Sequence, residues 1–187
     1  MIPSVFPRGE RSFQNDPRMR QALAQLSQKN QGMSSQGPAG TSLYWLLRSR
    51  RPKFAALVGK FTQADTLVLA CAMADCGAKL VANAREHETT RNVLSAAGLD
   101  WILRSGECLS CLHRLRPLDC LIVGDTNEPL SPWREQLGHE ALILGVSRRA
   151  SCVDSLAHRI RSEELAEDVS RLRDGRGSLL VASHDWI

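Results

Sequence analysis

The feature that most constrains the fold is a series of short, unbroken apolar segments separated by stretches with helical periodicity. The clearest is Leu118–Val123 (LDCLIV), which is apolar except for Asp119, and similar runs occupy Phe54–Val58 and Ala141–Val146. A strand that is apolar at successive positions is buried on both faces, as in a parallel sheet covered by helices on each side. The pattern therefore predicts an α/β fold with a doubly wound, mostly parallel sheet and helices on both faces.

The rest of the chain fits the same alternation. Further strands are predicted at Lys79–Ala82 and Trp101–Leu103, and helices at Arg18–Lys29, Leu43–Leu47, Ala64–Ala74, Thr89–Ala97, Cys108–Leu115, Trp133–Leu137 and Val153–Leu165. Near the end, Val169–Leu172 and Leu179–Val181 flank Asp174-Gly175-Arg176-Gly177, which is typical of a hairpin turn. We expect the sheet to finish with this antiparallel hairpin.

Charge separates the beginning of the chain from the remainder. Residues 1–53 contain nine Lys and Arg residues against two acids, a net charge of +7, whereas the rest carries −3. We expect a basic helical segment over residues 1–52 that packs on an α/β domain over residues 53–187. Because the basic residues are dispersed and aromatic residues make up only 5%, a solvated basic arm is favoured over specific nucleic-acid binding.

Because the sequence shows neither a membrane span nor a secretory signal, we expect an intracellular and most simply a cytoplasmic protein. No apolar run approaches the ~18 residues of a membrane span, and Met1–Glu10 lacks the basic start and apolar core of a secretory signal. The Arg-rich beginning leaves an organelle transit segment as an alternative, although Pro3, Pro7, Gly9 and Pro17 interrupt an amphipathic helix there. Neither secretion nor membrane insertion is expected.

The six cysteines are spread through apolar segments and are interpreted as reduced intracellular thiols. Cys108 and Cys111 form a single CxxC pair. Because a structural zinc site needs a second pair of ligands, buried small residues are favoured over zinc or redox chemistry.

Short motifs follow one another along nearly the whole chain. They are Ser4–Arg8 (SVFPR), Met33-Ser34-Ser35 before the Leu43–Leu47 helix, Gly59-Lys60-Phe61-Thr62, Lys79–Ala82 through Glu88, Ala97-Gly98-Leu99, Gly106, Leu118–Val123 and Asp174-Gly175. In this order they resemble the small-molecule O-methyltransferases of the caffeoyl-CoA and catechol type. The resemblance implies a class I methyltransferase, Rossmann-like fold and S-adenosylmethionine as the cofactor.

The resemblance also implies which residues would contact that cofactor, and these are Ser35, Gly59, Lys60, Asp65, Glu86 and Cys108. Several family positions are altered. The second glycine of the first loop matches Gln63, and the acid that binds the ribose hydroxyls matches Ala84. Glu86 or Glu88 would have to reach the ribose instead, but charge at a helix N-terminus is the favoured interpretation of both. We therefore expect weak binding of S-adenosylmethionine.

The metal ligands of the family are missing too. Its two carboxylates after the Leu118–Val123 strand match Gly124 and Thr126, the lysine that follows them matches Asn127, and its Asp-Asn pair after the next strand matches Gly145-Val146. We expect no divalent metal, although a one-residue slip would let Asp125, Asn127 and Glu128 form an improvised oxygen site.

These departures suggest a divergent O-methyltransferase-like protein with impaired or lost metal-dependent, catechol-type activity. An active metal-independent methyltransferase acting on a small hydroxylated acceptor, and a non-catalytic scaffold or RNA-associated module, are the alternatives. No catalytic residue and no acceptor are identified, and the segment between Ser147 and Asp174 is shorter than in the family. A homodimer or a protein partner is expected through the helices Arg18–Lys29 and Leu43–Leu47, unless their apolar stripes only cap the sheet.

Overall fold

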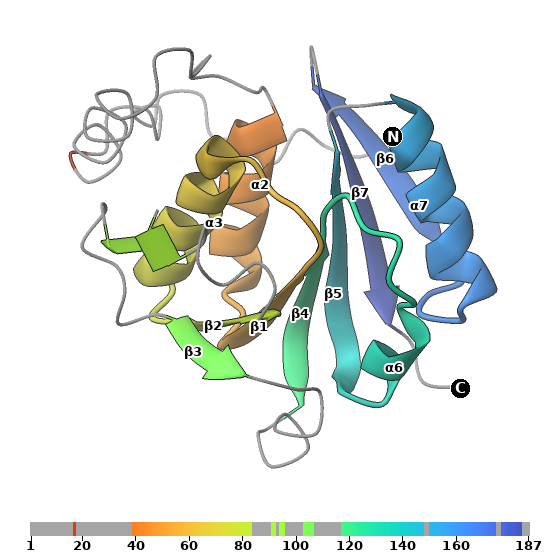
Figure 1. Ribbon diagram of the computed structural model, residues 1–187, viewed down its shortest axis with the longest axis horizontal. Helices are drawn as coiled ribbons and strands as arrows, with labels where there is room; N and C mark the ends of the chain where they lie inside the picture. Colours follow the sequence, from red (N-terminus) through yellow and green to blue (C-terminus); the bar gives the residue numbers. More distant parts are fainter. Residues whose placement is uncertain are drawn as a thin grey trace.

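The computed structural model of the 187-residue chain describes Pro17 and residues 39–83, 91–92, 94–95, 103–106, 117–147, 150–174 and 177–184. Within these ranges a seven-stranded sheet has the order β3-β2-β1-β4-β5-β7-β6 (Figure 1). The strands are β1 (Phe54–Val58), β2 (Lys79–Asn83), β3 (Leu103–Gly106), β4 (Leu118–Val123), β5 (Leu137–Ser147), β6 (Val169–Asp174) and β7 (Gly177–His184).

The sheet is parallel except at its C-terminal end. β1 pairs in parallel with β2 and β4, while β3 and β5 extend the parallel part on either side. β7 then runs antiparallel to both β5 and β6. The predicted mostly parallel sheet and its terminal antiparallel hairpin are confirmed.

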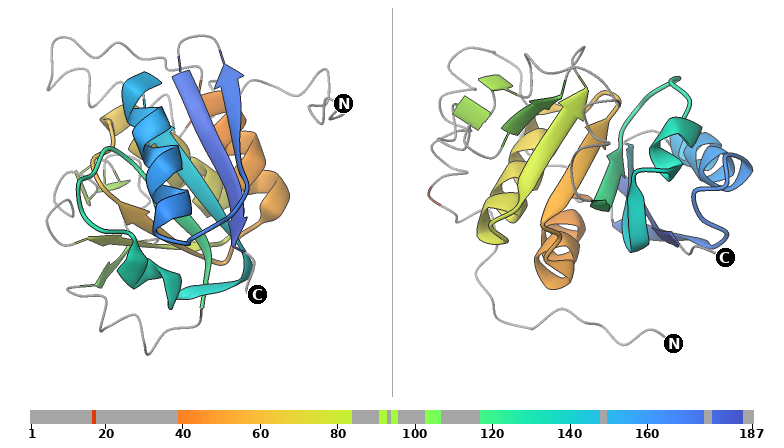
Figure 2. Two further views of the ribbon diagram at one scale, coloured as in Figure 1. Left: turned by 90° about the vertical axis from the view of Figure 1, so that its right-hand side faces the viewer. Right: turned by 90° about the horizontal axis from the view of Figure 1, so that it is seen from below.

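Helices cover both faces of the sheet, as predicted. The helices are α2 (Ala39–Arg50), α3 (Gln63–Asp75), α6 (Ser131–Arg134) and α7 (Ala150–Ser162). α2 and α3 pack on one face, and α7 packs on the other, so the strands lie between them (Figures 1 and 2). None of the helices in the described ranges is long and apolar enough to cross a membrane.

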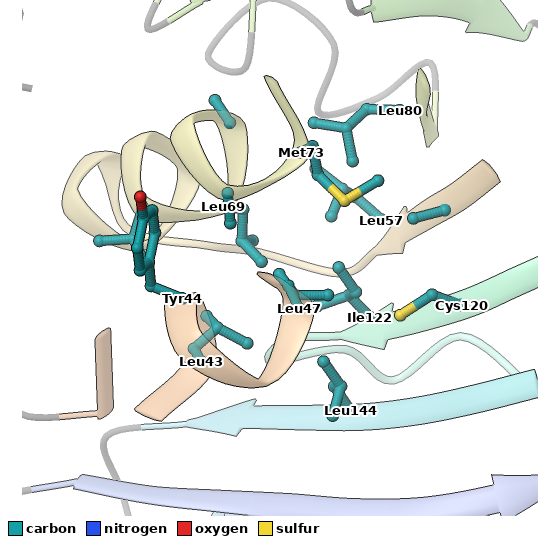
Figure 3. Close-up of a cluster of buried hydrophobic side chains, with 14 of the residues drawn as sticks. Leu43, Tyr44, Leu47, Leu57, Leu69, Met73, Leu80, Cys120, Ile122 and Leu144 are labelled. Atoms are coloured by element: carbon teal, nitrogen blue, oxygen red, sulfur yellow. The ribbon is translucent and has the colours of Figure 1, made fainter. Parts of the chain in front are cut away.

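Side chains at alternate positions of each central strand point to opposite faces of the sheet. Leu142 and Leu144 of β5 join the cluster under α2 and α3, whereas Ile143, between them, joins the cluster under α7. Leu43 and Leu47 of α2 are fully buried in the first cluster (Figure 3). This helix, which belongs to the predicted basic segment, therefore contributes to the core.

α3 is flanked by local signals that explain its bounds. Thr62 is its N-cap and accepts a hydrogen bond from the Asp65 amide through Oγ1. At the other end, Gly77 has a φ of +66°, and the next amide, of Ala78, donates to the Met73 carbonyl. Glycine favours this left-handed position, which reverses the chain toward β2.

Several predicted boundaries are wrong. The strand expected at Trp101–Leu103 continues past its predicted end, since β3 covers Leu103–Gly106, while Trp101 and Ile102 lie outside the described residues. The helix expected at Trp133–Leu137 is α6, which ends at Arg134. Pro132 in the first turn starts α6 early, while Leu137 pairs with Leu118 and opens β5.

Two further boundaries differ. β5 is longer than the apolar segment Ala141–Val146, since its pairing with β7 continues to Ser147. α7 stops at Ser162, before the predicted end at Leu165, because Glu164 takes a left-handed φ of +56°.

Other predictions cannot be compared in full. The helices expected at Arg18–Lys29 and Cys108–Leu115 lie outside the described residues. Residues 91–92 and 94–95 are helical, inside the predicted Thr89–Ala97 helix. The division into residues 1–52 and 53–187 stays a prediction.

Candidate functional site

The candidate site lies where the strand order reverses. From β1 the sheet continues through β2 to β3, and from β4 it continues in the opposite direction through β5. In open parallel sheets the crevice outside the carboxyl ends of two such strands is the usual ligand site. Gly59 and Lys60 follow β1 here, and Gly124 and Asp125 follow β4.

The two loops at this point are joined through their backbones. The Lys60 amide donates to the Asp125 carbonyl at 2.9 Å, and the Asp125 amide donates to the Lys60 carbonyl at 3.2 Å. The Gly124 amide donates to the Val58 carbonyl at 2.8 Å. This antiparallel bridge lies directly beyond the parallel strands and holds the ends of β1 and β4 together.

The glycines at the bridge are required by the chain's own packing. Gly59 has a φ of +92°, and a Cβ atom there would lie 2.8 Å from the Cβ of Thr126. A Cβ on Gly124 would overlap the Lys60 carbonyl oxygen. Both glycines are therefore needed where the loops after β1 and β4 approach each other closely.

Asp65 belongs to the cap of α3. Its Oδ2 accepts a hydrogen bond of 2.6 Å from the Thr62 hydroxyl, whose oxygen in turn accepts from the Asp65 amide at 3.1 Å. Asp65 is only 8% exposed. Its charge complements the partial positive charge of the helix N-terminus, which accounts for an acid at this position without a cofactor.

A cavity of about 910 Å³ opens beside the bridge, between the loop after β4 and α7. Its size is within the range of small-molecule sites. The lining residues are Lys60, Gly124, Asp125, Thr126, Asn127, Glu128, Pro129, Cys152, Ser155, Leu156 and Arg159.

Arg159 shapes the wall of this cavity. Its guanidinium donates to the Thr126 carbonyl at 2.6 Å and also to the carbonyl of Glu128. Its Nε donates to Glu163 at 3.2 Å, and the other Glu163 oxygen accepts the amides of Leu130 and Ser131. We call Arg159 and Glu163 the loop clamp, because together they bind the loop after β4 to the end of α7.

Asp125 presents a carboxylate at the cavity. Ser147, the last residue of β5, donates its hydroxyl to Oδ1 of Asp125 at 2.8 Å. Ser147 is only 5% exposed, so a buried residue of the neighbouring strand orients the acid. The arrangement is a preorganised hydrogen-bond acceptor on a rigid sheet edge.

Side chains that could ligate a metal do not gather among the described residues. No group of three or more His, Cys, Asp or Glu side chains that could hold a metal is found among them. Gly145 and Val146, where the resemblance would place an Asp-Asn pair after the strand, lie inside β5, and Val146 is buried. The improvised site of Asp125, Asn127 and Glu128 has the cation of Arg159 on two of its loop carbonyls, which opposes a second cation there.

The predicted cofactor residues are only partly described. Gly59 and Lys60 lie at the bridge and Asp65 lies in the cap of α3, whereas Ser35, Glu86 and Cys108 lie outside the described residues, as does Ala84. Sequence reasoning missed Ser147 and the loop clamp. Arg159 and Glu163 at i and i+4 on a helix are a visible pair, but nothing local shows that they bind a loop more than 30 residues away.

Comparisons with known proteins support the fold. No family model matches the chain, and no curated protein matches it either. Among solved structures, a methyltransferase from Geobacter sulfurreducens is similar with a TM-score of 0.63 at 18% identity, over 97% of this chain and 93% of that one. An O-methyltransferase from Bacillus cereus in complex with SAH has a TM-score of 0.61 at 14% identity, over 96% and 93% of the two chains.

A third similar structure is the O-methyltransferase TomG from Streptomyces achromogenes, involved in tomaymycin synthesis and determined in complex with SAM. Its TM-score is 0.59 at 17% identity, over 90% of each chain. These likenesses, together with the strand order, show that the chain has the class I methyltransferase fold, a mostly parallel α/β sheet with antiparallel C-terminal strands.

Proposed function

We propose that this chain is a divergent O-methyltransferase-like protein that has lost the metal-dependent, catechol-type reaction and binds S-adenosylmethionine weakly. The observation that carries the proposal is the loop clamp. A guanidinium holds the carbonyls of Thr126 and Glu128, in the loop where the resembling family places metal-binding carboxylates. A fixed internal cation at this loop lowers the affinity for a divalent cation.

Two observations support the part of the proposal that concerns the cofactor. The similar structures from Bacillus cereus and Streptomyces achromogenes contain SAH and SAM, which makes this the ligand to test. Ala84 also leaves the ribose without the charged acceptor that the family has, and a hydrogen bond to a charged group contributes about 1.5–3 kcal/mol.

Calorimetric titration with S-adenosylmethionine and S-adenosylhomocysteine tests the cofactor. We expect the wild type to bind the cofactor ten- to hundredfold more weakly than the double variant Ala84→Asp with Gln63→Gly. This ratio of dissociation constants corresponds to the free energy of the hydrogen bonds that the wild type lacks. Ala84→Asn with the same Gln63→Gly change is the matched control, since it adds a side chain of similar size without charge. Low-micromolar binding by the wild type that the double change weakens would contradict the proposal.

A parallel titration with magnesium and with calcium tests the metal. We expect no tight binding to the wild-type protein. A micromolar dissociation constant that Asp125→Ala abolishes would show that the improvised site exists and that the metal-dependent reaction cannot be taken as lost.

A further inference from the structure

Four basic side chains gather at the end of α2 and in the segment that leads into β1. They are Arg48, Arg50, Arg51 and Lys53, and all four are exposed. We call them the basic patch. Within the part of the chain that the structure describes, none of the four forms an ion pair. Because β1 runs from this end toward Gly59, the basic patch lies at the edge of the sheet opposite the candidate site (Figure 1).

The position of the basic patch at a helix end explains only part of its charge. Arg48 and Arg50 lie in the last turn of α2, where cations complement the partial negative charge of the helix C-terminus. Arg51 and Lys53 lie beyond the helix and are not needed for that role. The structure therefore leaves surplus positive charge exposed at this edge.

Two acids lie close to the basic patch, and both accept hydrogen bonds from the chain itself. Asp75, at the end of α3, accepts the Tyr44 hydroxyl, and Asp119 accepts two backbone amides, one of them that of Lys53 at 2.9 Å. Lys79 opens β2 beside the patch, since its amide donates to the Lys53 carbonyl at 2.9 Å. Five cations against two carboxylates leave a local charge of +3, which favours a polyanionic partner.

Arg48 adds a stacking surface to this charge. Its guanidinium carbon lies 5.2 Å from the ring centroid of Trp45 and 5.8 Å from that of Tyr44. Both rings are anchored, because Tyr44 is buried and Trp45 packs against the same core cluster. An exposed guanidinium held against two anchored rings offers a plane on which an unpaired base can stack.

We propose that the basic patch binds single-stranded nucleic acid, with phosphates at Arg50, Arg51 and Lys53 and a base stacked on Arg48. A single strand fits better than a duplex because its bases are open to stacking. Such contacts are independent of base sequence, unlike the specific recognition that the low aromatic content disfavours. The proposal goes beyond the loss of metal-dependent activity and does not rest on it.

Other polyanions fit the basic patch less well. Among the described residues the one exposed large apolar side chain is Leu172, on β6, so the patch lacks exposed apolar residues that would insert into a lipid surface. An acidic peptide would use the charge of the patch but would leave the stacked guanidinium without a partner.

Fluorescence anisotropy of the full chain with a labelled oligothymidylate of about 12 nucleotides tests the proposal. We expect a dissociation constant between about 1 and 100 μM at low salt. The slope of log K against log salt concentration should be about −2 to −3, since each phosphate contact on a single strand contributes about −0.7. A duplex of the same length should bind more weakly.

A double variant tests the phosphate contacts. Arg50→Gln with Arg51→Gln should weaken binding by about tenfold or more at low salt and reduce the magnitude of the slope by about 1.4. Arg134→Gln with Arg161→Gln is the matched control, because it removes the same charge from exposed residues of α6 and α7, which pack on the opposite face of the sheet from α2. The control should change the affinity by less than about twofold.

A charge-conserving variant tests the stacking. Arg48→Lys keeps the positive charge but removes the planar group. It should weaken binding of oligothymidylate by about two- to fivefold, as for the loss of a cation–π contact at an exposed site, and leave the salt slope unchanged. An abasic strand of the same length should bind wild type and Arg48→Lys equally, because it has no base to stack.

Several outcomes would overturn the proposal. They are equal effects of the two double variants, tighter binding of the duplex, competition by polyglutamate or by anionic vesicles as effective as that by unlabelled oligothymidylate, or no saturable binding at about 100 μM protein and low salt. The five Lys and Arg residues that precede α2 are present in every variant, so a difference between variants reports on the patch. Thermal unfolding shows whether each variant is folded. Because no cofactor or divalent metal is added, the result is independent of the cofactor and metal titrations.

Discussion

Arg159 and Glu163 form an ion pair one helical turn apart at the end of α7, with 3.2 Å between Nε and Oε1. Their side chains are 22% and 20% exposed. Each partner also bonds to the backbone of the loop after β4, through carbonyls for Arg159 and amides for Glu163. The loop that walls the cavity is thus held to this end of α7 through both carbonyls and amides.

We expect Glu163→Ala to lower the free energy of unfolding by about 2–4 kcal/mol, because it removes the charge partner of Arg159 and the acceptor of its Nε and of two loop amides. Denaturant unfolding measures the change. Glu164→Gln is the control, since its pair with Arg134 has side chains 46% and 70% exposed and should contribute under about 1 kcal/mol. Equal losses from the two variants would show that the clamp does not stabilise the fold.

Alanine at Gly59 should be more destabilising than alanine at Gly77. Both glycines have positive φ, but a Cβ at Gly77 meets no atom within 4 Å, while one at Gly59 meets Thr126. We expect about 1 kcal/mol for Gly77→Ala and about 2–4 kcal/mol for Gly59→Ala. Adding Thr126→Gly should recover part of the difference in thermal unfolding, and a purely additive double variant would contradict the contact.

Stability should fall with pH in the alkaline range because of Cys120. This thiol is fully buried on β4, and burial raises its pKa, with a smaller contribution in the same direction from the charge of Asp119. Above about pH 8.5 the unfolded chain loses this proton and the folded chain keeps it, so unfolding is favoured by about 1.4 kcal/mol per pH unit. Cys120→Ala should show a correspondingly shallower decline in unfolding free energy between pH 9 and 10.5, and parallel declines would contradict the assignment.

A homodimer, or a stable complex formed through the helices Arg18–Lys29 and Leu43–Leu47, stays a prediction. On α2 the apolar residues Leu43, Tyr44 and Leu47 are buried in the chain's own core, whereas Trp45 and Leu46 pack against it and are only partly buried. Sedimentation velocity of the full chain should show a species near twice 20.7 kDa. A strictly monomeric chain that recovers no stoichiometric partner from its native extract would exclude the complex.

Sequence pattern alone was sufficient for the main elements of the fold. Phe54–Val58 and Leu118–Val123 were predicted with the bounds that β1 and β4 have, because each is a short, mainly apolar run that ends at a glycine. The antiparallel hairpin was predicted from the turn residues between Asp174 and Gly177. Boundaries failed where long-range pairing extended β5 to Ser147.

What the sequence by itself determined is therefore the order of the main strands and helices along the chain and the fold class. Tertiary structure alone decided that Lys60 pairs with Asp125, that Ser147 orients that carboxylate, and that Arg159 and Glu163 hold the loop after β4. The physical reason is the distance along the sequence between the residues that interact. Apolar periodicity is a local property, whereas these polar contacts join residues 22 or more positions apart, and their partners become known only when the strands are in register.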